Sequence, residues 1–149
     1  MVRDRKIKSK KVILASDHAG FKLKEEIKKF LIKNRKKVLD LGTKNTNSVD
    51  YPDYAHLLSK KMKKSRNQFG ILVCGSGIGM SMSANKHKNI RAALCYNIKT
   101  AKLSRQHNNA NVMTIGAGLI KKNIVLKCVN AFLTTNFNGG RHLRRIKKI

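Results

Sequence analysis

Short apolar runs alternate with amphipathic segments along most of the chain, and this alternation constrains the fold more than any other feature. Five runs have the length and the Val, Ile, Leu and Ala content of buried strands; they are residues 12–15, 38–41, 71–74, 91–95 and 112–115. Helical patterns follow each run, at about residues 21–31, 54–62, 80–85, 98–107 and 124–133. This order predicts an α/β fold of three layers, Rossmann-like, with a five-stranded parallel sheet and helices on both faces.

One domain is expected, because a chain of 149 residues that is 41% apolar can form a single core. The first eleven residues include six Lys or Arg. We predict a flexible basic arm at 1–11 and a single domain at 12–149. The longest apolar run near the N-terminus has four residues, too short for a signal peptide or a membrane span, which predicts a cytosolic protein.

The chain carries 34 Lys and Arg against 7 Asp and Glu, a formal net charge of +27. Such a charge attracts polyanions, so a nucleic-acid-binding module is an alternative to an enzyme. However, the lysines are scattered through every segment, and only eight Phe and Tyr residues are available to stack on bases. Charge alone therefore does not decide the function.

All seven carboxylates lie in the first 53 residues, so acid–base chemistry further along must use Cys, His or Tyr. The three cysteines form no CxxC pair, and no two histidines have metal-ligand spacing, so we expect no disulfide, no metal and no cofactor. A dinucleotide site is disfavoured, because the glycine-rich turn lacks an acidic residue about 20 positions later.

In an open parallel sheet, ligands bind at the carboxyl ends of the strands. The third run ends in Cys74 and the glycine turn 75–79, whose backbone N–H groups can hold an anion or an oxyanion. Cys74 itself is either a reactive thiolate at this turn or a small buried hydrophobic residue; Cys95 and Cys128 fit the second description.

Other polar residues flank the runs. Asp17 and His18 follow the first run and suit hydroxyl binding or proton handling, although Asp17 also suits a helix cap. His107 can exchange a proton near neutral pH. We expect the segments that contain Asp17, Cys74 and His107 to converge on one rim of the sheet, and His56 and His87 to be solvated. Arg141 and Arg145 would share a helical face that suits a phosphate, or belong to a solvated tail.

Six segments in order, SDHAG (16–20), DYPDYA (50–55), CGSGIG (74–79), ANK (84–86), SRQHN (104–108) and GGRH (139–142), resemble the type B ribose-5-phosphate isomerase family, which includes galactose-6-phosphate isomerase subunits. The resemblance spans about residues 12–145. It implies an aldose–ketose isomerase of the pentose phosphate pathway that interconverts ribose 5-phosphate and ribulose 5-phosphate. An isomerase of a six-carbon sugar phosphate, allose or galactose 6-phosphate, is the alternative.

The same resemblance assigns roles. Cys74 would be the base that forms an enediolate, the N–H groups of Gly75, Ser76, Gly77, Ile78 and Gly79 would hold its oxyanion, and His107 would open the sugar ring with help from Asp17. The substrate contacts would be His18, Arg141 and Arg145 on the phosphate, Asn108 on a hydroxyl, and Tyr51 as a lining residue.

Three further points follow from the resemblance. Some members of the family carry a glutamate base after the glycine turn, where this chain has Met80. The family often has arginine after the fifth strand, where this chain has Gly118, so this cationic contact is either absent or supplied by Lys121 or Lys122. The family builds its site between two subunits, with the ring-opening histidine contributed by the neighbour. This implies a homodimer as the minimum active unit or a tetramer, and no specific nucleic acid or membrane partner.

Overall fold

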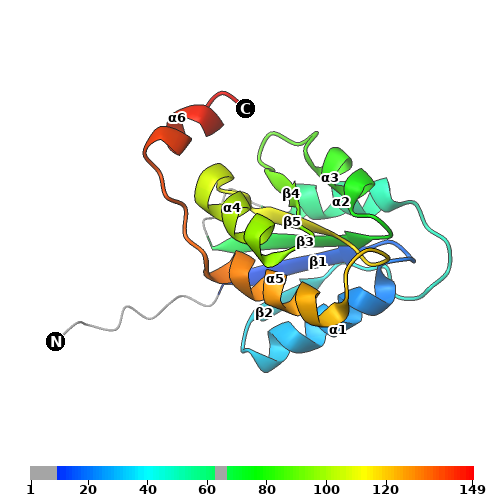
Figure 1. Cartoon of the computed structure of the whole chain (residues 1–149). Coiled ribbons are helices and arrows are strands. Elements are labelled where there is room, and N and C mark those ends of the chain that lie inside the picture. Colours follow the sequence, from blue (N-terminus) through cyan, green and yellow to red (C-terminus); the bar gives the residue numbers. More distant parts are fainter. Residues whose placement is uncertain (1–9, 63–66) are drawn as a thin grey trace.

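The computed structural model describes residues 10–62 and 67–149. Five strands and six helices follow one another in the order β1 (Lys11–Ser16), α1 (Phe21–Lys33), β2 (Lys37–Asp40), α2 (Tyr51–Lys61), β3 (Gln68–Cys74), α3 (Ile78–Ala84), β4 (Ala92–Leu94), α4 (Ile98–Asn108), β5 (Val112–Gly116), α5 (Lys122–Thr134) and α6 (Arg141–Ile146). The predicted five-stranded parallel sheet is confirmed. Its strand order is β2-β1-β3-β5-β4 (Figure 1).

The sheet places the ends of its three central strands at one edge. Ser16 pairs with Val73 and Cys74 pairs with Gly116, each across a parallel ladder. Because the helices return the chain to the opposite edge, every loop that follows a strand lies at this carboxyl edge. The glycine turn and the Asp17 loop are therefore neighbours.

A hydrophobic core covers each face of the sheet, as expected for a parallel sheet buried on both sides. On one face, Ile27 and Leu31 of α1 and Phe132 of α5 pack against Val12 and Ile71. On the other face, Leu58 of α2 and Met80 and Ala84 of α3 pack against Ile13 and Leu72. The two helices that border the glycine turn, α2 and α3, therefore share one layer (Figure 1).

Element boundaries differ from the expectations by a few residues. Helix α2 begins at Tyr51 rather than 54, because Pro52 occupies its first turn, where a missing N–H has no consequence. Helix α3 begins at Ile78, directly after Gly77 in the left-handed region with φ 77°. Strand β4 is limited to Ala92–Leu94. Strand β1 begins at Lys11, and most of the predicted basic arm, residues 1–9, lies outside the described residues.

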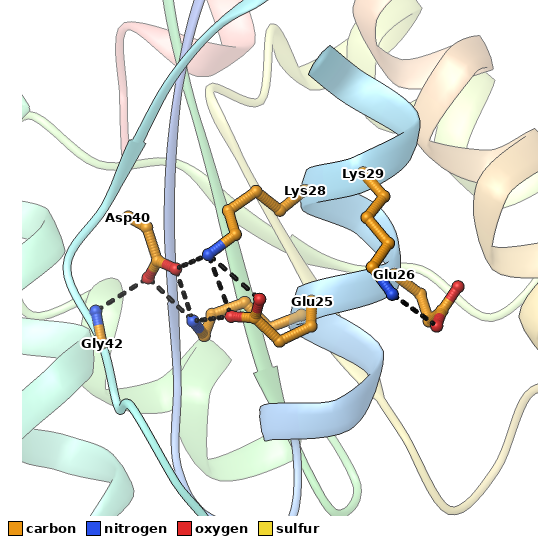
Figure 2. Close-up of polar contacts among 7 residues, drawn as sticks. Glu25, Glu26, Lys28, Lys29, Asp40 and Gly42 are labelled. Carbon is orange, nitrogen blue, oxygen red and sulfur yellow. Dashed lines mark hydrogen bonds and ion pairs between the residues drawn. The ribbon is translucent and has the colours of Figure 1, made fainter. Parts of the chain in front are cut away.

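A cluster of four charged side chains joins α1 to the end of β2 (Figure 2). Lys24 is only 1% exposed, and its Nζ contacts Asp40 at 2.7 Å and Glu25 at 3.0 Å. Lys28 bridges the same two carboxylates at 2.8 and 3.0 Å. Asp40 also accepts the Gly42 N–H at 2.9 Å, and Gly42 in turn accepts the Ser16 N–H at 2.8 Å. The cluster therefore supports the backbone next to Asp17.

The charges of this cluster shift one another's protonation. Burial opposes ionisation of Asp40 and Glu25, but hydrogen bonds from Lys24 and Lys28 outweigh it and lower the pKa of both carboxyl groups. The bond to Asp40 raises the pKa of Lys28. Both carboxylates and Lys28 are therefore held in their charged forms at neutral pH.

Helix α6 lies at the end of an extended segment beside α4 and apart from the sheet (Figure 1). None of its residues is buried. Within residues 10–62 and 67–149, no helix combines the length and the apolar content needed to cross a bilayer.

Candidate active site at the carboxyl edge of the sheet

A cavity of about 460 Å³ opens at the carboxyl edge of the sheet. Its lining comes from the loop after β1, the start of α2, the end of β3 and the glycine turn with α3: Asp17, Ala19, Tyr51, Cys74, Gly75, Ser76, Ile78, Gly79 and Met82. Seven of these were predicted as site residues. None of the nine side chains carries a positive charge.

Cys74, at the end of β3, supplies the thiol among the residues that line this cavity. Its side chain is 4% exposed, and its Sγ accepts a hydrogen bond from the Gly77 N–H at 3.1 Å. An N–H directed at sulfur stabilises negative charge on that atom. Met80, at the position where some family members have glutamate, is fully buried in the core and cannot exchange protons.

Close backbone packing fixes the glycine turn. A Cβ on Gly77 would lie 2.8 Å from the carbonyl carbon of Ile115, so the turn rests directly on β5. A Cβ on Gly79 would lie 2.5 Å from the Tyr51 ring, so the ring covers the start of α3. Only glycine permits both approaches.

Asp17 and His18 are both held by the backbone. Asp17 is 6% exposed and its Oδ1 accepts the Gly20 N–H at 2.9 Å, directly before α1, so it both lines the cavity and caps a turn. His18 Nδ1 lies 3.1 Å from the Val49 nitrogen and 3.2 Å from the Val49 carbonyl oxygen, so the Val49 backbone can hold the ring in either tautomer. His18 does not line the cavity that contains Cys74.

The expected convergence of the His107 segment on this rim is not found within one chain; the family resemblance implies that the ring-opening histidine comes from a neighbouring subunit. Helix α4 returns from the carboxyl edge and ends at Asn108, just before β5 begins at Val112. The four residue steps of β5 from Val112 to Gly116 span about 13 Å, so His107 and Asn108 lie toward the opposite edge of the sheet from Cys74.

His107 and Asn108 are the last two residues of α4, beside which α6 lies (Figure 1). The His107 ring stacks on His142 with centroids 4.3 Å apart and planes 10° apart. Partial burial and the positive charges of His107, Arg141 and Arg145 lower the pKa of His142. Arg141 and Arg145 are four residues apart in α6, as predicted, and both are exposed.

Arg105 fixes the end of α4 that carries His107. It is 8% exposed, its guanidinium lies 4.9 Å from the centroid of the Phe69 ring, and its NH1 donates to the Asn109 side chain at 3.0 Å and to the Ala110 carbonyl. Its Nε donates to the Thr135 carbonyl at 3.3 Å, at the start of the segment that leads to α6. The orientation of α4 and the course of that segment are therefore coupled.

Several site features escaped the sequence-based reasoning. Met82 and Ala19 line the cavity but were not predicted as site residues. Met82 could have been predicted from its helical spacing from Ile78, whereas Ala19 had no such signal. His142 belongs to the GGRH segment (139–142), but no role was predicted for it. His56 and His87 are partly exposed, but they also contact each other, which was not predicted: His56 Nδ1 lies 2.8 Å from His87 Nε2.

The remaining candidates have simpler environments. Cys95 and Cys128 are buried, and burial raises the pKa of Cys95 to about 12, which makes it inert. Lys121 and Lys122 are the candidates to replace the arginine that the family often has after the fifth strand. Lys122 forms an ion pair with Glu26 at 3.5 Å, so Lys121 is the better candidate. The Gly118 N–H donates to the Gly75 carbonyl at 3.0 Å, so this loop touches the glycine turn.

A second cavity, of about 560 Å³, lies between the end of β2 and the start of α2. Asp50 and Asp53 line it, together with five uncharged residues. Two carboxylates repel a phosphate, so this cavity does not suit a sugar phosphate as well as the one that contains Cys74.

Comparison with known proteins agrees with this architecture. The family model described as Ribose/Galactose Isomerase matches residues 12–149. Ribose-5-phosphate isomerase B of Escherichia coli is 39% identical over 140 residues, which are 94% of each protein. The crystal structure of a ribose 5-phosphate isomerase from Thermotoga maritima has a TM-score of 0.90 at 47% identity, covering 93% of this chain and 96% of that one.

A structure of ribose-5-phosphate isomerase B from Mycoplasma genitalium, with bound ribulose-5-phosphate, is similarly close. Its TM-score is 0.90 at 45% identity, and the match covers 93% of this chain and 92% of that one. The motif resemblance noted in the sequence is thus confirmed across nearly the full length, and the chain belongs to the ribose/galactose isomerase family.

Proposed function

We propose that this chain interconverts ribose 5-phosphate and ribulose 5-phosphate, with Cys74 as the catalytic base. The observation that carries the proposal is the position of Cys74, whose Sγ lines the carboxyl-edge cavity and accepts the Gly77 N–H. Relatives named ribose-5-phosphate isomerase B, one of them with bound ribulose-5-phosphate, support the choice of substrate. The reaction would belong to the pentose phosphate pathway in the cytosol.

In the proposed mechanism, the Cys74 thiolate removes the proton from C2 of the open-chain aldose and returns it to C1 through an enediolate. The oxygen that gains negative charge would be held by N–H groups of the turn Gly75 to Gly79. The Gly79 N–H lies in the first turn of α3, where no intrahelical acceptor exists, and the Ile78 N–H, also in this turn, donates to Ser76 Oγ at 3.3 Å. Asp17 would assist at the ring hydroxyls, and Tyr51 would line one side of the sugar.

The phosphate requires residues from elsewhere, because the cavity lining contains no Lys, Arg or His. The α4–α6 group has the missing chemistry: His107 to open the ring, Asn108 for a hydroxyl, and Arg141 and Arg145 for the phosphate. It lies toward the other edge of the same sheet. We therefore propose a homodimer in which each cavity receives this group from the partner, with His18 as a further phosphate contact.

The rim of the cavity fits a surface that a second subunit covers. Tyr51, Ile78 and Met82 line the cavity and are 39%, 46% and 66% exposed. Exposed apolar groups gathered beside a site are a feature of protein interfaces. The same surface gives no reason to choose between a dimer and a tetramer built from such dimers.

A coupled assay with ribose 5-phosphate tests the chemical roles. Cys74→Ala should lose turnover with little change in KM, because proton abstraction acts in the transition state, whereas Arg141→Ala should mainly raise KM. Lys33→Ala, in the last turn of α1, is a control of equal charge change on an exposed residue that has no proposed role. Full activity in Cys74→Ala would eliminate the mechanism.

Mixing two inactive variants tests the shared site. Cys74→Ala and His107→Ala each lack one half of every site, but a mixed dimer contains one intact site and one site that lacks both groups. Random exchange of equal amounts should restore about a quarter of wild-type activity, since half of the dimers are mixed and each has one working site. Each variant mixed with itself should stay inactive. Absence of any recovery after proven subunit exchange would contradict a site built from two subunits.

A six-carbon sugar phosphate remains the alternative substrate, because the family is described as both ribose and galactose isomerases. Comparing kcat/KM for ribose, allose and galactose phosphates with the same preparation distinguishes these possibilities. A preference for a six-carbon substrate would replace the ribose assignment without affecting the roles of Cys74 and His107.

A further inference from the structure

The carboxylate side chains of the described residues all lie at or near the carboxyl edge of the sheet. They follow β1, end β2, begin α2 or belong to the first half of α1: Asp17, Asp40, Asp50, Asp53, Glu25 and Glu26. Seven residues, about 10 Å of helix, separate Glu26 from the end of α1. Three residue steps of β2, also about 10 Å, separate Asp40 from Lys37. Among the described residues, the amino edge therefore has no carboxylate side chain.

Cations gather at this amino edge where β1 and β2 begin. Five of them, here called the basic edge, come from the start of β1, the turn after α1 and the start of β2: Lys10, Lys11, Arg35, Lys36 and Lys37. Lys11 and Lys37 are register partners on neighbouring parallel strands, about 4.8 Å apart. Within residues 10–62 and 67–149, none of the five forms an ion pair. The basic edge therefore lacks counter-charges of its own.

The charges of the basic edge repel one another. Burial, followed by the positive charges of Arg105 and Lys36, lowers the pKa of Lys10. Arg35 and Lys37 are exposed, so a partner can reach them from solvent. The nearest carboxylates on the same elements lie about one Debye length away at 0.1 M salt, too far to offset this repulsion. An anion bound across the edge would offset it, so the surface favours a polyanionic partner.

The form of the basic edge selects the kind of polyanion. None of its five residues lines any of the three cavities of about 440–560 Å³, so the cations form an open row rather than a pocket for a small anion. Among the described residues, the exposed aromatic side chains are Tyr51 and Tyr96, which lie at the carboxyl edge. Unpaired bases would therefore have no ring to stack on at the basic edge. A regular phosphate backbone, as in a duplex, suits it better.

We propose that the basic edge binds the phosphate backbone of double-stranded DNA without reading its sequence. Double-stranded RNA is recognised largely through its ribose 2′-hydroxyls, and the described part of this edge offers no carboxylate to accept their hydrogen bonds. The five residue steps of β1 from Lys11 to Ser16 span about 17 Å, so bound DNA would lie away from the cavity that contains Cys74. The chain would therefore keep its cavity open while it is held on DNA.

Fluorescence anisotropy tests this surface, with a labelled 20-base-pair DNA duplex titrated by the untagged full-length protein at 50–200 mM NaCl. The triple variant Arg35→Gln/Lys36→Gln/Lys37→Gln removes three charges from the basic edge. The double variant Lys11→Gln/Lys37→Gln removes the register partners and leaves the turn after α1 unchanged. The free energy of unfolding, measured by urea titration, verifies that each variant folds.

A second triple variant, Lys22→Gln/Lys44→Gln/Lys127→Gln, is the matched control. It removes three exposed charges from the start of α1, the loop after β2 and the middle of α5. Both triple variants lower the net charge of +27 by the same amount. Binding that depends on net charge alone would therefore weaken equally in the two proteins.

For the wild type, the logarithm of the binding constant should fall with the logarithm of the salt concentration with a slope of about −3, as expected for three to four neutralised phosphates. The control variant should bind within about threefold of the wild type. The basic-edge triple variant should bind at least tenfold more weakly at 50 mM NaCl, with a slope smaller in magnitude by about 2–3, and the double variant should lie between them.

The proposal is overturned if the two triple variants bind the duplex equally well. It is also overturned if single-stranded DNA, double-stranded RNA or anionic phospholipid vesicles bind tenfold more tightly than the duplex at the same phosphate concentration. Saturating duplex should leave the alkylation of Cys74 by iodoacetamide unchanged. Protection of Cys74 would place the DNA at the carboxyl edge and contradict the proposal.

Discussion

Replacing the partly buried Asp40 by a neutral residue should destabilise the fold far more than replacing an exposed carboxylate of the neighbouring helix α1. In Asp40→Asn, Lys24 stays 1% exposed but loses its contacts at 2.7 and 2.8 Å, and only Glu25 remains near its ammonium group. Breaking a buried ion pair costs about 3–5 kcal/mol. Because the Asp40 side chain is 22% exposed and Glu25 persists, we expect a loss of about 2–3 kcal/mol.

Glu26→Gln is the matched control, an isosteric loss of one carboxylate charge from α1. Glu26 contacts Lys29 at 3.6 Å and Lys122 at 3.5 Å, and all three side chains are well exposed (Figure 2 shows the pair with Lys29). Exposed pairs contribute at most about 1 kcal/mol. The free energy of unfolding, measured by urea titration with far-UV circular dichroism at one protein concentration, should therefore separate the two variants clearly.

The dependence on pH gives the same prediction a second readout. The native pKa of Asp40 lies below its ordinary value, so this carboxylate stabilises the fold fully above the ordinary carboxyl range and progressively less as pH falls through the lowered native pKa. The difference in the free energy of unfolding between wild type and Asp40→Asn should stay constant from about pH 8 to about pH 5 and decrease below about pH 4. Equal stabilities of Asp40→Asn and Glu26→Gln at neutral pH would refute the reasoning.

Two further perturbations test the catalytic cavity. Gly79→Ala places a Cβ 2.5 Å from the Tyr51 ring, whose far end can move away. The KM for ribose 5-phosphate should therefore rise, while the free energy of unfolding falls by no more than about 1–2 kcal/mol. An unchanged KM would show that Tyr51 does not line the bound sugar. Iodoacetamide should alkylate Cys74 of the native protein before Cys95, as followed by mass spectrometry. Cys74 lines a cavity, whereas burial raises the pKa of Cys95 to about 12. Faster modification of Cys95 would contradict this order.

The sequence predicted the elements that depend on local pattern. The apolar runs at 12–15, 71–74 and 112–115 became the three central strands, because a strand buried on both faces must be almost continuously apolar. The glycine turn was equally visible, since residue 77 needs a positive φ. The start of α2 was missed, because Tyr51 and Pro52 interrupt the apolar period that marks the rest of the helix.

Features that depend on which side chains meet in space could not be predicted. Lys24 resembles the other lysines of α1 in the sequence, yet the ends of β2 and α1 enclose it between Asp40 and Glu25. His56 and His87 are 31 residues apart, so their contact follows only from the packing of α2 against α3. Neither pair has a local signal.

The displacement of His107 from the cavity follows from topology rather than from side chains. A residue at the end of a helix that follows a parallel strand must lie at the amino edge of the sheet, because the helix returns the chain there. Cys74, at the end of a strand, must lie at the carboxyl edge. A reaction that needs both residues therefore cannot be completed within one such domain, whatever the rotamers of the two side chains.

The distribution of charge leads to the same conclusion independently. The chain has a net charge of +27, yet no cationic residue lines its catalytic cavity. Arg141 and Arg145 are exposed on α6, which packs against α4. A sugar phosphate bound in that cavity would have an unpaired dianion. Buried phosphates need charge-assisted partners. In the proposed homodimer, Arg141 and Arg145 of the neighbouring subunit would supply these partners together with His18, and the exposed Ile78 and Met82 would lie at the surface across which α6 reaches. The proposal therefore assigns the enediolate chemistry and most of the phosphate recognition to different copies of the same chain.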